Sequence, residues 1–243
     1  MAGVFCWTSL SRLPKLCTQA HRGFTMIQPK AAILYFAPAG VYVDAHIVPL
    51  TADMAEAQIM RDWWNEVCLE LSSDQEPIDR HWDWRDLAIE YGGRILRSEK
   101  LAIVTGDGAV QGAMLISTEA VDSGLTKGAR TLFVELLFTA PRNRPDLRID
   151  KAPYFTGVGT ELLRWAADFS RRLGYEGHVR LDASPDFVDW YERRGLQKLN
   201  ADPIVFEGVR YTPMELPAEA ANELLDFPPV SQRGAKHARK KRQ

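Results

Sequence analysis

A turn suited to anion binding stands at residues 156–160, where the sequence reads Thr-Gly-Val-Gly-Thr. It lies between an apolar run, Thr131 to Thr139, and a segment with helical spacing of apolar residues. Two glycines let the backbone approach a ligand, and the start of the next helix offers unpaired N–H groups and the positive end of its dipole. These residues indicate a phosphate-binding turn, with an ordinary strand-to-helix turn as the alternative.

Two common phosphate-binding turns do not fit this segment. A dinucleotide-binding turn requires a third glycine at the position of Leu162, and a Walker turn requires a Lys-Ser or Lys-Thr pair, which does not follow Gly159. The neighbouring segments must therefore identify the anion.

Composition predicts an ordinary globular protein without a disulfide framework. The chain has 243 residues, of which 46% are hydrophobic, enough for one substantial core in one domain or at most two. Its cysteines, Cys6, Cys17 and Cys68, have neither paired nor metal-ligand spacing, so we expect a reducing compartment and no metal site. No apolar run approaches the roughly 18 residues that a membrane span needs.

Charge is unevenly distributed along the chain. All acidic residues lie between Asp44 and Asp226, and this body carries 20 basic against 32 acidic residues, a formal charge of −12. An acidic body repels nucleic acid, which leaves only the basic tail, from Arg233 to Arg242, as a candidate nucleic-acid contact. We interpret this tail as a solvated, disordered end.

The chain is predicted to have three parts. Residues 1–40 form an acid-free leader, either disordered or a transit peptide, unless Met26 is the true start. Residues 41–216 form the folded domain, and residues 217–243 an extension with a short helix and the basic tail. We expect a cytoplasmic location, with the mitochondrial matrix as the alternative if the leader is a transit peptide.

Apolar periodicity and turn residues predict the elements of the domain. A helix is expected from Thr51, a second after Pro77, and a hairpin turn at Asp107-Gly108. A loose connection should cover residues 118–130, and Gly174 should end the helix that follows the glycine turn. The expected strands are 41–48, 101–104, 110–117, 131–139, 179–181, 196–199 and 209–216, with a further short helix at 187–194.

This order of elements, together with three motifs, resembles the GNAT superfamily of acyl-CoA-dependent N-acetyltransferases over about residues 41–216. The family's pyrophosphate signature is Gln or Arg, two residues, Gly, one residue, and Gly or Ala. Gly157 and Gly159 match it, whereas Tyr154 stands at its first position. Thr139-Ala-Pro141 is similar to the family's strand ending, and the stretch from Arg142 to Pro153 is longer than the family norm.

The other two motifs lie downstream. The segment from Ser184 to Leu196 is similar to a family segment that ends in Tyr-Glu-Lys-x-Gly-Phe, with Tyr191 and Gly195 in place and Ser184 replacing an asparagine. The run from Tyr211 to Leu216 resembles the family's final strand.

The resemblance implies an α/β (α+β) fold with a mixed, mostly antiparallel sheet of six to seven strands and helices on both faces. It also implies transfer of an acetyl or other acyl group from acetyl-CoA to a primary amine by direct attack. No covalent acyl-enzyme is expected, because no cysteine lies near the glycine turn. Self-association as a homodimer stays open.

The resemblance also implies site residues. Tyr191 would act as general acid, since a phenol stays protonated at neutral pH, and Glu135 as base, on the face that alternation gives to Leu137 and Thr139. A core tyrosine and a solvent-facing glutamate are the alternatives. The residues implied for coenzyme binding are Leu137, Phe138, Thr139, Phe155, Thr156, Gly157, Val158, Gly159, Thr160 and Ser184.

Two further groups of residues are candidates for substrate contacts. The basic residues of the inserted stretch would bind the 3′-phosphate of coenzyme A or be solvated: Arg142, Arg144, Arg148 and Lys151. An aromatic and acidic group would form the acceptor site or fill the core: Asp62, Trp63, Trp64, His81, Trp82, Asp83 and Trp84.

Two other functions remain open at this point. A GNAT-like chain that binds acyl-CoA or a partner without catalysis is compatible with the departures at Tyr154 and Ser184. A nucleic-acid-associated protein that uses the basic tail is disfavoured by the charge of the body.

Overall fold

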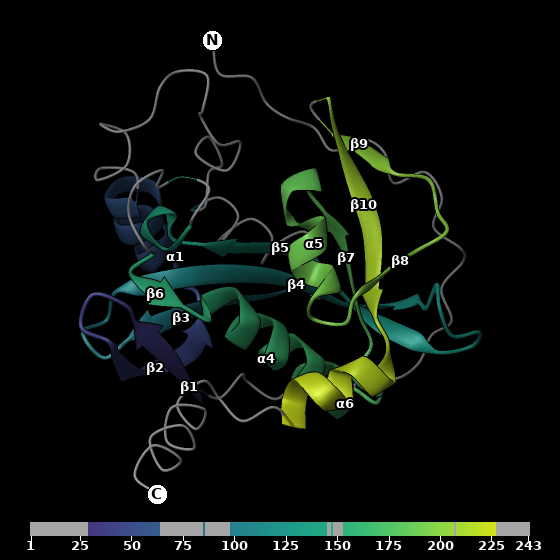
Figure 1. Cartoon of the computed structure of the whole chain (residues 1–243), viewed down its shortest axis with the longest axis horizontal. Helices are drawn as coiled ribbons and strands as arrows, with labels where there is room; N and C mark the ends of the chain where they lie inside the picture. The colour runs from purple at the N-terminus through teal and green to yellow at the C-terminus, as the bar shows by residue number, and fades with distance from the viewer. Residues whose placement is uncertain are drawn as a thin grey trace, which may run out of the picture.

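The structure is a computed structural model of the whole chain that describes residues 29–63, 85, 98–144, 147, 153–206 and 208–226. Its centre is a mixed sheet, which Figure 1 shows with α4 and α6 on one face and α1 on the other. None of the described helices has the length and apolar character needed to cross a membrane.

The described strands form one ten-stranded sheet in the order β6-β1-β2-β3-β4-β5-β7-β10-β8, with β9 paired to β10. All pairs are antiparallel except β5 with β7. The strands are β1 (Lys30–Phe36), β2 (Val41–Pro49), β3 (Ser98–Thr105), β4 (Val110–Asp122), β5 (Arg130–Thr139), β6 (Phe155–Thr156), β7 (Val179–Ala183), β8 (Gln197–Lys198), β9 (Ile204–Phe206) and β10 (Val209–Leu216).

Helical segments connect and cover these strands. Thr51 caps the first of them, as expected, because its hydroxyl oxygen accepts from Met54 N at 3.2 Å. The segments are α1 (Ala52–Met54), η1 (Ala55–Asp62, π-helical), η3 (Pro141–Asn143, 3-10), α4 (Val158–Arg172), η5 (Pro185–Phe187, 3-10), α5 (Val188–Glu192) and α6 (Ala218–Asp226).

The mixed, mostly antiparallel sheet predicted from the sequence is confirmed, but three expectations were wrong. The sheet begins at Lys30, inside the segment assigned to the leader, because β1 pairs with β2 along its whole length. The connection expected over residues 118–130 is shorter, since β4 extends to Asp122 and β5 begins at Arg130. The strand number exceeds six to seven because β1, β6 and β9 join the sheet.

Two hydrophobic clusters hold the sheet and helices together. The larger packs α4 and α6 on one face, with Leu34, Met114, Leu162, Trp165 and Met214 fully buried. The smaller packs η1 on the other face through Ile59 and Trp63. The helix predicted after residue 217 is α6, and its Ala221 and Leu224 belong to the larger cluster. The expected helix after Pro77 lies outside the described residues.

Candidate functional site

Strands β5 and β7 diverge at their carboxyl ends. They pair only through Leu132 with Val179 and Phe133 with Arg180, although β5 runs on to Thr139 and β7 to Ala183. A β-bulge explains the divergence, because pairing of β4 with β5 skips Glu135, and a bulge bends and twists its strand. The end of β5 around Leu137 therefore lies beyond its last pair with β7.

The bulge also changes which side chains share a face of β5. Val134 and Leu137 pack against the cluster under α4, whereas Leu136 and Phe138 pack against the cluster under η1. The simple alternation that gave Glu135 the face of Leu137 is therefore interrupted at this position. Glu135 is half-buried, and burial raises the pKa of its carboxyl above the ordinary value.

The glycine turn begins α4 as predicted. Gly157 is the N-cap with φ 93°, a left-handed conformation that glycine adopts without Cβ strain, and it supplies no side-chain cap. The first N–H groups of an α-helix have no partner within the helix. The first turn of α4 is therefore suited to an anion.

Close packing fixes the start of α4 beside the divergent strands. A Cβ at Gly159 would lie 3.2 Å from the Trp190 ring and 3.6 Å from Leu137 Cδ2. A Cβ at Gly112 on β4 would lie only 2.6 Å from Val158 Cγ1. The fold thus brings Leu137 of β5, Gly159 of α4 and Trp190 of α5 together.

Other predicted coenzyme contacts are placed differently. The N–H of Phe155, expected among the phosphate donors, donates to Asn143 Oδ1 at 2.9 Å, and Thr156 pairs with Tyr35 in the ladder of β6 with β1. The Thr160 hydroxyl accepts from Arg194 Nε at 3.0 Å. Ser184 is half-buried directly after β7. The available backbone donors therefore begin at the α4 cap rather than at Phe155.

A buried amide pair, absent from the sequence-based prediction, holds the chain that leads to α4. Asn143 Nδ2 donates to Gln111 Oε1 at 3.1 Å and lies 3.3 Å from the Gln111 carbonyl oxygen. Both side chains are buried, and Asn143 also receives the Phe155 N–H. This pair links η3 to β4 and to β6. The sequence does not indicate this pair, because Asn143 and Gln111 are distant from each other along the chain.

Tyr191 lies in α5 next to the start of α4. Its side chain is 8% exposed, and its ring meets Trp190 edge-on with centroids 4.9 Å apart. Burial raises the pKa of this phenol, which therefore stays protonated at neutral pH. Arg194, not predicted as a site residue, lies over the Trp190 ring, its Cζ 3.5 Å from the centroid.

The inserted basic stretch is only partly described. Arg142 Nε donates to Gln111 Oε1 at 3.3 Å, which ties this arginine to the amide pair. The Arg144 guanidinium lies 5.9 Å from the Phe187 ring centroid, so it reaches from the end of β5 to the start of α5. Arg148 and Lys151 lie outside the described residues.

The predicted acceptor region is also partly described. Trp63 is 6% exposed, and its Nε1 donates to the Val110 carbonyl at 3.0 Å, so it fills the core. A cavity of about 80 Å³ adjoins it, lined by Asp62, Gln58 and Arg142 among others, and is smaller than typical ligand pockets. Outside the described residues lie Trp64, His81, Trp82, Asp83 and Trp84.

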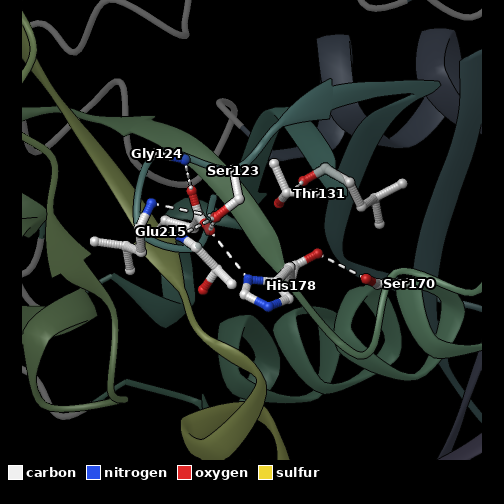
Figure 2. Close-up of polar contacts among 9 residues, drawn as sticks. Ser123, Gly124, Thr131, Ser170, His178 and Glu215 are labelled. Carbon is white, nitrogen blue, oxygen red and sulfur yellow. Dashed lines mark hydrogen bonds and ion pairs between the residues drawn. The ribbon is translucent and has the colours of Figure 1, made fainter. Parts of the chain in front are cut away.

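A second polar cluster, shown in Figure 2, surrounds Glu215 of β10. Its carboxylate accepts from the Ser123 hydroxyl and from Gly124 N at 2.8 Å, and Oε1 lies 3.0 Å from His178 Nδ1. The His178 carbonyl accepts from the Ser170 hydroxyl at 2.6 Å. The cluster thus joins the turn after β4, the chain before β7, α4 and β10.

This serine, histidine and glutamate do not form a nucleophilic triad. In such a triad the histidine bridges the hydroxyl and the carboxylate, whereas here Glu215 bridges Ser123 and His178. Glu215 is fully buried and His178 is 2% exposed, so a substrate has no access. The cluster also lies at the start of β7, away from the divergent ends. We assign it a structural role.

Known proteins resemble this chain in structure and, over one segment, in sequence. Comparison with curated protein sequences found no match. Among solved structures, the chain is similar to the spermidine N-acetyltransferase of Vibrio cholerae in complex with CoA and spermine, at 13% identity over 73% of this chain and 98% of that one, with a TM-score of 0.47.

Two further structures are similar to parts of the chain. One is the histone acetyltransferase HPA2 and related acetyltransferase of Corynebacterium glutamicum, at 16% identity over 70% of this chain and 94% of that one, with a TM-score of 0.43. The other is nourseothricin acetyltransferase, at 23% identity over 50% of this chain and 66% of that one, with a TM-score of 0.38.

A family model described as the acetyltransferase (GNAT) domain matches residues 146–218. The matched segment contains the glycine turn, α4, β7, α5 and β10, whereas β4 and β5 lie before it. The resemblance to the GNAT superfamily is thereby confirmed over these residues.

Proposed function

We propose that the protein is an N-acyltransferase that transfers an acetyl group from acetyl-CoA to a primary amine. One observation carries the proposal: the uncapped first turn of α4 lies against Leu137, at the point where β5 has separated from β7. A turn suited to an anion thus adjoins the part of β5 that lies beyond its last pair with β7. This arrangement suits a ligand with a diphosphate at one end and an amide-containing arm at the other.

In the proposed complex, N–H groups at the start of α4 bind the diphosphate of the coenzyme. The backbone of β5 from Leu137 to Thr139, beyond the last pair of β5 with β7, binds the pantetheine arm. The side chain of Leu137 packs along the arm, and Ser184 at the end of β7 borders it.

The proposed reaction is a direct attack. The neutral amine nitrogen attacks the thioester carbonyl carbon, a C–N bond forms, and the C–S bond breaks. Glu135 accepts the proton that the ammonium group of the acceptor loses, directly or through water. Its raised pKa brings it closer to the working pH than an ordinary glutamate, which favours this role. Tyr191 donates a proton to the departing thiolate, and the proton that the nitrogen loses as the amide forms returns to the Tyr191 phenolate, directly or through water.

A second candidate function rests on the burial of Tyr191. This side chain is 8% exposed and belongs to the larger hydrophobic cluster. If Tyr191 serves only in packing, the protein would bind acyl-CoA without catalysing transfer.

For either function we infer a reducing compartment such as the cytoplasm, because the spacing of the cysteines predicts no disulfide framework.

Two measurements test these proposals in order. Acetyl-CoA at saturating concentration should raise the melting temperature, since a ligand that binds only the folded state stabilises it. Release of free thiol from acetyl-CoA should then depend on an added primary amine. An unchanged melting temperature would overturn both candidates, and coenzyme binding without amine-dependent thiol release would favour the binder.

Tyr191→Phe separates the catalytic role from the packing role. We expect kcat to fall about 100-fold while coenzyme affinity stays within about twofold, because general acid catalysis contributes roughly 10²–10⁴. The control is Tyr175→Phe, since Tyr175 lies beyond the carboxyl end of α4 and also packs against the larger cluster. Equal rates for the two variants would remove Tyr191 from the mechanism.

A further inference from the structure

The guanidinium of Arg194 is held against the first turn of α4. Its Nε donates to the Thr160 hydroxyl at 3.0 Å, and Nη1 donates to the Trp190 carbonyl at 2.9 Å. The guanidinium lies over the Trp190 ring, with 3.5 Å between Cζ and the ring centroid. Two hydrogen bonds and a stacked ring therefore fix this side chain, while further N–H groups of the guanidinium remain available.

Arg194 has no anionic partner within the described part of the chain. None of the ion pairs there includes it, and its neighbour in sequence, Arg193, is another cation. Burial and this neighbour lower the pKa of Arg194 to about 10. A partly buried cation without a counter-charge is costly, and a bound anion is the usual compensation.

The glycine turn lacks a cation of its own. From Ala152 to Leu163 the sequence contains neither lysine nor arginine. The positive charge at the start of α4 therefore comes only from backbone dipoles, which carry roughly half a unit charge, whereas a diphosphate diester carries about two negative charges. Arg194 is the cation that the fold adds to this turn, from an element that follows α4 in the chain.

We propose that Arg194 binds the diphosphate of acyl-CoA at the first turn of α4 and supplies the positive charge that the turn itself lacks. This inference rests on the proposed function, because it concerns the grip on the same coenzyme. Thr160 and Trp190 act as positioning residues: the hydroxyl orients the guanidinium, and the ring prevents it from turning into solvent.

The test compares ligands with and without the diphosphate. Affinities of the full-length protein for CoA, for dephospho-CoA and for pantetheine are measured by calorimetry. In Arg194→Gln we expect affinity for CoA and dephospho-CoA to fall about 10- to 100-fold, the range for a lost charge-assisted hydrogen bond. Affinity for pantetheine should stay within about twofold. The control, Arg193→Gln, removes an exposed charge one residue away and should leave the affinities for all three ligands unchanged.

Arg194→Lys keeps the charge but loses the planar fork and the stacking on Trp190, so we expect an intermediate loss. The affinity of the unchanged protein for CoA should also fall more steeply with ionic strength than that of Arg194→Gln. Unchanged CoA affinity in Arg194→Gln, or an equal loss for pantetheine, would overturn the inference and leave the proposed function standing. Absence of CoA binding by the unchanged protein would overturn both.

Discussion

Gly112 is expected to be essential for the position of α4, because no side chain fits between β4 and this helix. In Gly112→Ala the new Cβ would lie 2.6 Å from Val158 Cγ1 and 2.8 Å from the Phe138 carbonyl oxygen. Carbon atoms in contact are about 3.5–4.0 Å apart, so α4 or β5 must move by about 1 Å. Overpacking of this kind costs about 1–3 kcal/mol of unfolding free energy.

The functional loss should exceed the loss of stability. Val158 is the first residue of α4, and Phe138 precedes the end of β5, so the displacement acts on both parts of the proposed coenzyme site. A misplacement of about 1 Å costs on the order of 100-fold in rate. We therefore expect kcat/KM to fall about 100-fold and the affinity for acetyl-CoA to decrease.

Gly106→Ala is the matched control. Gly106 lies in the β3–β4 turn of the same hairpin, nothing surrounds its Cβ position within 4 Å, and its φ is outside the left-handed region. Urea denaturation measures the unfolding free energy of both variants, and thiol release measures their activity. If Gly112→Ala matched Gly106→Ala in stability and in coenzyme affinity, the contact between β4 and the start of α4 would not determine the site.

Two further predictions concern buried carboxylates. Because burial raises the pKa of Glu135, its carboxylate becomes available as a base only above the ordinary value of 4.5, so kcat/KM should fall as pH decreases through this higher pKa. Glu135→Gln should remove that acid limb, and an unchanged pH profile would exclude Glu135 as the base. Glu215→Gln places an amide donor among groups that donate to the carboxylate. We therefore expect the unfolding free energy, measured by urea denaturation, to fall by about 3 kcal/mol. Glu219→Gln, on the exposed face of α6, is its control, and equal stability of the two variants would contradict the structural role of the cluster.

Elements with local signals were predictable from the sequence. The hairpin at Asp107 is stabilised within the turn itself, since the Thr105 hydroxyl and Ala109 N donate to its carboxylate. The α4 helix follows from its apolar stripe and from Gly174, which has φ 84° at its end. In each case the residues that determine the structure are neighbours along the chain.

Elements that depend on distant partners were not predictable. β1 follows an acid-free segment that resembles a leader, and it becomes a strand only through its pairing with β2 and β6. The bulge at Glu135 arises from the register of β5 against β4, which no local pattern encodes. The same holds for Arg194, whose hydrogen-bond partner Thr160 is 34 residues away in sequence.

The two glycines of the turn at residues 156–160 therefore have different reasons to be glycine. Gly157 is required for its positive φ, which ends the strand and leaves the first turn of α4 without a side-chain cap. Gly159 is required for packing, because a side chain there would push against the Trp190 ring at 3.2 Å. Since Arg194 lies on that ring, the second glycine sets how closely the cation approaches α4. The sequence pattern alone suggested that both glycines let the backbone approach a ligand. In the fold, Gly157 shapes the proposed anion-binding turn, and Gly159 lets the Arg194 guanidinium lie close to it.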